Sequence, residues 1–423
     1  MASIEVAKKE STPPPWMRRF FTLWAGQAFS LLGSALVQWA LMFWVAVTTA
    51  SPLDLAIAGA MGLLPQVFLS PFAGAYVDRH DRKKVMLFAD LLTALGTLIL
   101  MLLFVAQAIA LWHIFIVMFF RSAMQAFHWP AMQASTALMV PKDHLARITG
   151  LNQSVMGLTS IMGPALGAFL YVALPMYLVL GMDVVTAAMA ITALLVVRIP
   201  EIRKPKGREK TPILRDLVEA FRYVQAWKGA LLVVAVFSVV NFLITPAFTF
   251  FNLLTLYHFG QGPYQAAFMD VMLGAGMITG GLILGMWGGS KRKIVTCIGA
   301  LASSGGGVLL IGVLPPDGFL IAATTALFIG TGLSIVNGIV MAILQKGIRA
   351  DMQGRVFALL SSLSSGMAPL GLALSGPFAA VFGIQAWFIA GGLIMVVVSA
   401  SLFFVPVVLN IEDHIAEAVA IEQ

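Results

Sequence analysis

The sequence consists mainly of long apolar runs separated by short charged loops. The runs 53–77 and 85–106 lie on either side of the charged stretch 78–84. About 20 apolar residues suffice to cross a bilayer as a helix, and both runs reach that length. The stretch between them is too short for a folded domain, so the chain must leave the membrane and re-enter it at once. Because the runs are continuous rather than alternating, they exclude a β-barrel and predict an all-α integral membrane protein.

The composition supports the same conclusion. Hydrophobic residues make up 60% of the 423 residues and charged residues only 11%, whereas soluble proteins carry about 25% charged residues. The chain therefore has too little polar surface to cover a water-exposed globule. Cys297 is the single cysteine, which excludes an intrachain disulfide, and its apolar surroundings favour a packing role.

The positive charges occupy alternate loops. The net charge of +7 is compatible with a nucleic-acid partner, but of the 26 Lys and Arg residues only Arg121 lies inside an apolar run. The others fall in the tails and in one set of loops: 79–84, 142–147, 198–228, 291–293 and 346–355. By the positive-inside rule, we expect both termini in the cytoplasm, a multi-pass protein of a bacterial-type inner (plasma) membrane, and no nucleic-acid partner. The first run is too long for a signal-peptide core.

The runs predict about twelve membrane spans. Their expected limits are 20–48, 53–77, 85–106, 111–139, 147–172, 176–198, 229–257, 265–288, 294–313, 319–345, 355–381 and 385–409. We expect a cytoplasmic tail (1–17), a six-helix half (18–199), a linker (200–228), a second six-helix half (229–409) and a second tail (410–423). Leu214, Leu217, Val218, Phe221 and Val224 follow at helical spacing in the linker, which predicts an amphipathic helix on the inner membrane surface.

The two halves repeat each other in sequence. Residues 141–154 read PKDHLARITGLNQS and residues 349–362 read RADMQGRVFALLSS. Asp143 and Arg147 in the first segment match Asp351 and Arg355 in the second at one offset. Such a repeat predicts two parallel halves of similar structure.

The loop between the second and third runs carries a short ordered pattern. Gly74 is followed by Asp78, Arg79, Arg82 and Lys83. This order resembles the signature loop of the major facilitator superfamily, and the resemblance implies a gating role for these five residues. Gly74 is expected to allow a close helix contact, and Asp78 to cap a helix or pair with a base. The corresponding loop of the second half, 288–291, contains no acid.

Polar residues inside the apolar runs form stripes. Such residues are costly in lipid, about 2.5–3.5 kcal/mol for a central Arg or Asp. The stripes lie in the first, fourth, seventh and tenth runs and include Gln27, Ser34, Gln38, Arg121, Gln125, His128, Asn241, Thr245, Asn252 and Asn337. Hydrogen bonds that only hold helices together are one explanation. A central aqueous cavity lined by corresponding helices is the other, and it is the one we expect.

Arg121 requires a partner because a guanidinium keeps its charge. The acids inside the runs are Asp90, Asp183 and Asp270. Together with Arg121 they are candidates for proton coupling. An ion pair with Arg121 would instead keep an acid charged, and the sequence does not choose between these two roles. Asp183 is the first candidate for proton coupling, followed by Asp270 and Asp90.

The fifth run contains Gly150, Gly163, Pro164 and Gly167. These residues suit close helix packing. Their spacing also resembles the antiporter motif that exporters of the superfamily carry in this helix, which implies export.

No enzyme signature is present. The sequence lacks a phosphate-binding Gly-rich loop, a Cys/His cluster and a nucleophile elbow, so we expect no enzymatic activity, no metal and no cofactor other than a proton gradient. Segments 24–27, 77–84, 120–122 and 354–357 resemble the macrolide-efflux branch of drug:proton antiporters.

That resemblance implies a proton-coupled exporter of bulky amphipathic compounds that works by alternating access. Its expected partners are a small-molecule substrate and membrane lipid, and it is expected to act as a monomer. A siderophore exporter and a lysophospholipid flippase or importer of the same fold remain as alternatives.

Overall fold

A computed structural model of the chain describes residues 15–200, 228–290, 292–348 and 353–412. These residues form helices and no strands. The first half contains α1 (Pro15–Thr49), α2 (Pro52–Arg79), α3 (Arg82–Val105), α4 (Leu111–Met139), α5 (Lys142–Ala173) and α6 (Met176–Val196). The second contains α8 (Lys228–Leu253), the π-helical turn η1 (Leu254–His258), α9 (Pro263–Trp287), α10 (Lys293–Val313), α11 (Phe319–Gly347), α12 (Gln353–Phe382), α13 (Ile384–Leu402) and α14 (Pro406–Leu409).

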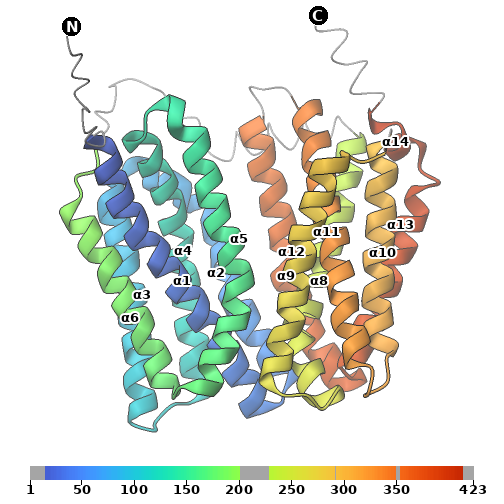
Figure 1. The fold of residues 1–423 in the computed structure, drawn as a ribbon, viewed down its shortest axis with the longest axis horizontal. Helices are drawn as coiled ribbons and strands as arrows, with labels where there is room; N and C mark the ends of the chain where they lie inside the picture. Colours follow the sequence, from blue (N-terminus) through green and yellow to red (C-terminus); the bar gives the residue numbers. More distant parts are fainter. Residues whose placement is uncertain (1–14, 201–227, 291, 349–352, 413–423) are drawn as a thin grey trace, which may run out of the picture.

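The long helices form two bundles that stand side by side, α1 to α6 and α8 to α13 (Figure 1). By length and composition, ten helices of the described part can cross a membrane, and Gly366–Phe382 in α12 is a shorter apolar helix. The helix α4 is not among the ten, because its polar stripe lowers its hydropathy. The prediction of an all-α membrane protein with about twelve helices in two six-helix halves is confirmed.

The repeat of the two halves also governs how they meet. The helix α5 of the first half packs on α9, and the corresponding α12 of the second half packs on α2. Within the halves, α2 packs on α4 as α9 packs on α11. Residues 142–154 in α5 and 353–362 in α12, which the structure describes, therefore belong to two equivalent helices at the interface.

One predicted span is divided in the structure. The last predicted span, 385–409, is not one helix, because α13 ends at Leu402 and α14 begins at Pro406. Pro406 disfavours helical geometry in the residue before it, and Val405 is extended, with φ −106° and ψ 98°. The linker helix predicted between 201 and 227 lies outside the described residues.

One of the two roles expected of Asp78, capping a helix, belongs to another residue of the signature loop. Asp81, rather than Asp78, is the N-cap of α3, and its carboxylate accepts hydrogen bonds from the backbone N–H groups of Lys83 (2.9 Å) and Lys84 (3.5 Å). The side chain of Lys83 donates to the carbonyls of Leu195 (3.1 Å) and Val197 (2.9 Å) at the end of α6.

The expected close helix contact at Gly74 is absent among the described residues, since a Cβ there would meet none of their atoms within 4 Å. The side chain of Asp78 lies outside the described set. Arg79 and Arg82 both have interaction partners.

The two halves are joined at one face. The start of α1 and the short helix α14 lie at the opposite face (Figure 1). At the joined face the hydroxyl of Tyr257 donates to the carbonyls of Ala46 (3.1 Å) and Val47 (3.3 Å). In the same region Phe43 of α1 packs with Ala168 of α5 and with Ala266 and Ala267 of α9.

Candidate functional site

A cavity of about 620 Å³ lies between the two halves, near the middle of the helices. Its walls come from α1, α2 and α5 of the first half and from α8, α9 and α11 of the second. They are mostly apolar and include Trp39, Met42, Phe248 and Met277. Ligand sites of about 300–1,000 Å³ with few polar groups are typical of proteins that bind small molecules. We call this space the central cavity.

The central cavity contains one of the three predicted acids. Asp270 of α9 lines it, and only 6% of the residue is exposed. Its Oδ2 atom is buried and accepts no hydrogen bond from any described residue. Burying an uncompensated carboxylate is costly, so this position favours either a protonated acid or a cationic group beside it. Gln38 and Thr245 of the predicted stripes also line the cavity.

The glycines of α5 set how closely this helix approaches α1. A Cβ on Gly167 would lie 2.6 Å from Cβ of Trp39, and a Cβ on Gly163 would lie 2.9 Å from its Cδ1. Glycine is therefore required at both positions for this contact, while Pro164 faces the central cavity. Gly150 belongs to the same helix, but no contact is described for it. The motif thus packs α5 against α1.

Arg121 and Asp183 form an ion pair inside the first half. Arg121 of α4 is 7% exposed and Asp183 of α6 is fully buried, and Nη1 lies 2.5 Å from Oδ2. Arg121 also donates to the hydroxyl of Thr97 and to the carbonyl of Ser34 (3.3 Å). Asp183 in addition accepts hydrogen bonds from the hydroxyls of Ser34 (3.0 Å) and Thr97 (2.9 Å).

This arrangement answers the question of which acid pairs with Arg121. Three donors hold the Asp183 carboxylate, and one of them, Arg121, is charged. Thr97 completes the cluster, yet sequence reasoning missed it, because a single Thr in an apolar run carries no stripe signal. Both charges are compensated where they lie.

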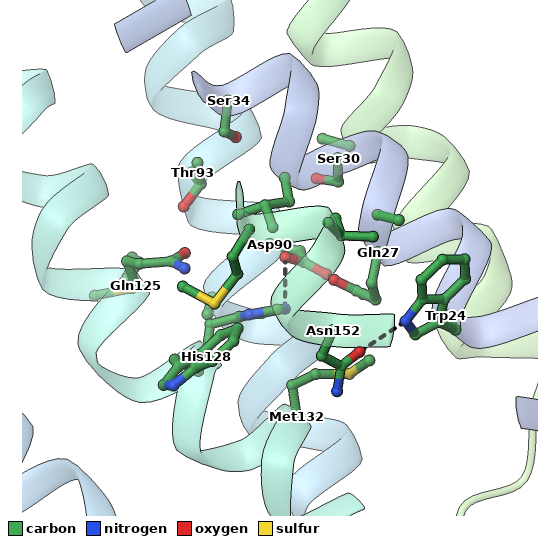
Figure 2. Close-up of a pocket in the computed structure, with 18 of the residues that line it drawn as sticks. Trp24, Gln27, Ser30, Ser34, Asp90, Thr93, Gln125, His128, Met132 and Asn152 are labelled. Atoms are coloured by element: carbon green, nitrogen blue, oxygen red, sulfur yellow. Dashed lines mark hydrogen bonds and ion pairs between the residues drawn. The ribbon is translucent and has the colours of Figure 1, made fainter. Parts of the chain in front are cut away.

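A second polar site lies within the first half, between the central cavity and the face where α1 begins. It surrounds a pocket of about 80 Å³ and is drawn in Figure 2. Asp90 of α3 accepts a hydrogen bond from Nε2 of Gln27 at 3.0 Å. Its other oxygen lies 3.2 Å from Nε2 of His128, within ion-pair distance but outside hydrogen-bond geometry. We call this the Asp90–His128 pocket.

The wall of the Asp90–His128 pocket is completed by neighbouring helices. The indole N–H of Trp24 in α1 donates to Oδ1 of Asn152 in α5 at 2.8 Å (Figure 2). Ser34 and Gln125 also line the pocket. The sequence analysis missed Trp24 and Asn152, whose partners lie far away in the sequence.

The remaining stripe residues lie elsewhere. The side chains of Asn241 and Asn337 donate to carbonyls of their own helices, Phe237 (2.9 Å) and Leu333 (3.0 Å). Asn252 is fully buried, and its amide atoms have no described partner. None of the three is among the residues that line the central cavity or the Asp90–His128 pocket. The stripe residues thus lie in several places instead of lining one cavity: some line one of the two pockets, Arg121 forms an ion pair, Asn241 and Asn337 bond within their helices, and Asn252 is buried without a described partner. Among the described side chains, no three His, Cys, Asp or Glu residues are grouped to hold a metal ion.

Comparison with known proteins shows the family. A model described as Major Facilitator Superfamily matches residues 23–372. Macrolide efflux protein A of Streptococcus pyogenes is 32% identical over 384 residues, which cover 91% of this chain and 95% of that protein. The multidrug efflux pump Tap of Mycolicibacterium fortuitum is 25% identical over 84% of this chain and 88% of that protein.

Solved structures show the same fold. The nucleoside transporter NupG superposes with a TM-score of 0.67 at 14% identity and covers 91% of this chain and 98% of that chain. A bacterial homologue of the human lysosomal transporter Spinster, in an inward-facing conformation, also has a TM-score of 0.67 at 14% identity, with 95% and 99% covered. The sequence resemblance to the macrolide-efflux branch is confirmed. This chain is a multi-pass membrane transporter and belongs to the Major Facilitator Superfamily.

Proposed function

We propose that this transporter is a proton-coupled exporter of bulky amphipathic compounds of the macrolide type. The central cavity carries the proposal, because both halves line it and its mostly apolar walls include Trp39, Phe248, Met42 and Met277. Such walls offer adaptable contact area to a large apolar body. The buried and unpaired Asp270 adds one polar group able to receive a cationic or hydrogen-bonding part of the cargo.

The cavity position suits alternating access, in which two halves rock about a site near the membrane midplane. The contacts of Tyr257 and the Phe43 cluster join the halves at one face. With the termini in the cytoplasm of a bacterial cell, that face is extracellular, and the structure corresponds to a state closed toward the outside.

Export is supported by the relatives named above, which are efflux proteins. The spacing of Gly150, Gly163, Pro164 and Gly167 in α5 resembles the antiporter motif of exporters, and proton coupling is the part of the proposal that this resemblance adds. The chain draws on the proton gradient and requires no cofactor, and it works as a monomer in contact with lipid.

The test is transport by the purified full-length protein in proteoliposomes with an imposed pH gradient. Radiolabelled erythromycin, a siderophore and a lysophospholipid serve as probes. We expect accumulation of erythromycin that depends on the gradient and stops when a protonophore is added. Accumulation of only the siderophore or only the lysophospholipid would refute the macrolide assignment. Transport of erythromycin that ignores the gradient would refute the coupling.

A matched pair of variants locates the cargo. Thr245 lines the central cavity, whereas Thr324 is exposed on α11. Thr245→Trp fills part of the cavity and should strongly reduce erythromycin transport. Thr324→Trp adds the same side chain toward lipid and should leave transport unchanged. Equal transport by both variants would show that the cargo does not pass through the central cavity.

A further inference from the structure

We infer that Asp90 and His128 together bind the proton whose movement drives export, at a site inside the first half and apart from the cargo. The inference rests on the proposed function for the existence of proton coupling, and it adds where the proton binds. It assigns His128 a role as proton acceptor and Asp90 a role as its counter-charge.

The geometry of the pair suits one exchangeable proton. Asp90 Oδ1 and His128 Nε2 lie 3.2 Å apart, and each side chain is close to nine-tenths buried. With a neutral imidazole the pair carries one uncompensated negative charge, and with a protonated imidazole it carries none. Histidine is the side chain whose ordinary titration range includes physiological pH. Uptake of one proton therefore turns a simple contact into a charge-assisted hydrogen bond.

No other described side chain in the pocket competes for this proton. The helix α1 contributes Trp24, Gln27, Ser30 and Ser34, α3 contributes Thr93, α4 contributes Gln125 and Gln133, α5 contributes Asn152, and α6 contributes Ala187. These groups are uncharged. Gln27 fixes the other oxygen of Asp90 at 3.0 Å and so orients the carboxylate toward His128.

Besides Asp90, the buried charged residues described in the first half are Arg121 and Asp183, and these two already form an ion pair. Ser34 links the two sites, because it lines the Asp90–His128 pocket and also donates to Asp183 at 3.0 Å. Asp183 is held by Arg121, Thr97 and Ser34. The ion pair thus holds α4 to α6. In the Asp90–His128 pair, by contrast, the negative charge of Asp90 is compensated only when His128 takes up a proton.

The Asp90–His128 pocket and the central cavity share no lining residue, yet they share two helices. On α5, Met156 lines the pocket and the next residue, Gly157, lines the cavity. On α1, Ser34 lines the pocket and Gln38, one turn further, lines the cavity. A proton that changes the charge of the pocket can therefore act on the cargo site through α1 and α5 without occupying it.

The first test separates coupling from transport in proteoliposomes with radiolabelled erythromycin. Exchange of labelled for unlabelled erythromycin at equal pH on both sides needs no net proton movement, whereas accumulation against a gradient does. His128→Gln and Asp90→Asn should lose gradient-driven accumulation and retain exchange at the wild-type rate. His144→Gln, an exposed histidine on α5, is the matched control and should retain both.

Asp270→Asn distinguishes the alternatives. If this variant exchanges without accumulating while His128→Gln still accumulates, the coupling proton binds in the central cavity and the inference is overturned, although the exporter function stands. Loss of both exchange and accumulation in His128→Gln protein that remains monodisperse and folded also overturns it. If the wild type shows no gradient-driven transport, the proposed function itself fails.

A measurement on the wild type keeps the inference testable if the variants do not fold. Erythromycin affinity is measured in detergent as the pH is lowered. When proton and cargo bind separate, coupled sites, the dissociation constant rises and then reaches a plateau, since the coupling free energy is finite. When the proton and the cargo compete for one carboxylate, the dissociation constant continues to rise. It then rises about tenfold for each pH unit, as expected for competition with one proton. A plateau supports the pair, and an unbroken rise overturns it.

Discussion

The Arg121–Asp183 ion pair allows a prediction whose magnitude follows from its geometry. Arg121→Met leaves the fully buried Asp183 with only the hydroxyls of Thr97 and Ser34 as donors. Removing one partner of a buried pair costs about 3–5 kcal/mol. Protonation of the remaining carboxyl limits this cost, since neutralising an ordinary Asp at pH 7 takes about 4 kcal/mol. We therefore expect a loss of about 3–4 kcal/mol in the free energy of unfolding at pH 7.

The double variant Arg121→Met/Asp183→Leu removes both charges. Replacing a whole buried pair by apolar residues is often neutral or stabilising, so we expect its stability to return to within about 1–2 kcal/mol of the wild type. Asp183→Leu alone should be the least stable of the three, because Arg121 cannot give up its charge. Arg121→Lys keeps the charge but loses the planar fork that reaches three acceptors, so it should rescue only part of the stability and of the transport.

The assay is denaturant unfolding of the purified full-length variants in mixed micelles, followed by tryptophan fluorescence. Arg198 is exposed beyond the end of α6, and Arg198→Met serves as the control for loss of one positive charge. The reasoning is refuted if Arg121→Met unfolds with the free energy of the control. It is equally refuted if the double variant loses the sum of the two single losses, because independent residues would add.

Three further predictions concern other parts of the molecule. Asp270→Asn should raise the KM for a cationic macrolide about tenfold or more, because hydrogen bonds to charged groups contribute about 1.5–3 kcal/mol. The KM for an uncharged analogue should stay nearly unchanged. Equal effects on both compounds would show that Asp270 does not face the charge of the cargo. Gly167→Ala should lower the free energy of unfolding by about 1–3 kcal/mol through overpacking against Trp39, whereas Gly157→Ala, where a Cβ would meet nothing within 4 Å, should not; a thermal scan of both variants decides. Asp81→Ala removes the N-cap of α3 and should cost about 0.5–2 kcal/mol in the same scan, and an unchanged melting temperature would contradict the cap.

The sequence by itself determined the membrane class, the number of spans and the division into two halves. These features depend on local quantities, namely the length of each apolar run and the charge of each loop. Both can be read along the chain, because the thickness of the bilayer sets the length of a span and the charge of a loop sets the side on which it lies. The close packing of α5 could also be predicted from the sequence, because Gly163 and Gly167 lie one turn apart. In the structure only glycine fits against Trp39 at this distance. The N-cap at Asp81 was open to the same local reasoning, since Asp directly before a helix is a frequent cap.

Tertiary structure alone decided which acid pairs with Arg121 and how the polar stripes divide. Asp90, Asp183 and Asp270 lie in three different helices, and helical periodicity places each on a face without saying which helix that face meets. The packing of α1, α3, α4 and α6 brings Asp183 to Arg121 and Asp90 to His128, while the contact between the halves leaves Asp270 beside the central cavity. Pairing depends on the rotation and depth of separate helices, which contacts between distant segments set and the local sequence does not encode.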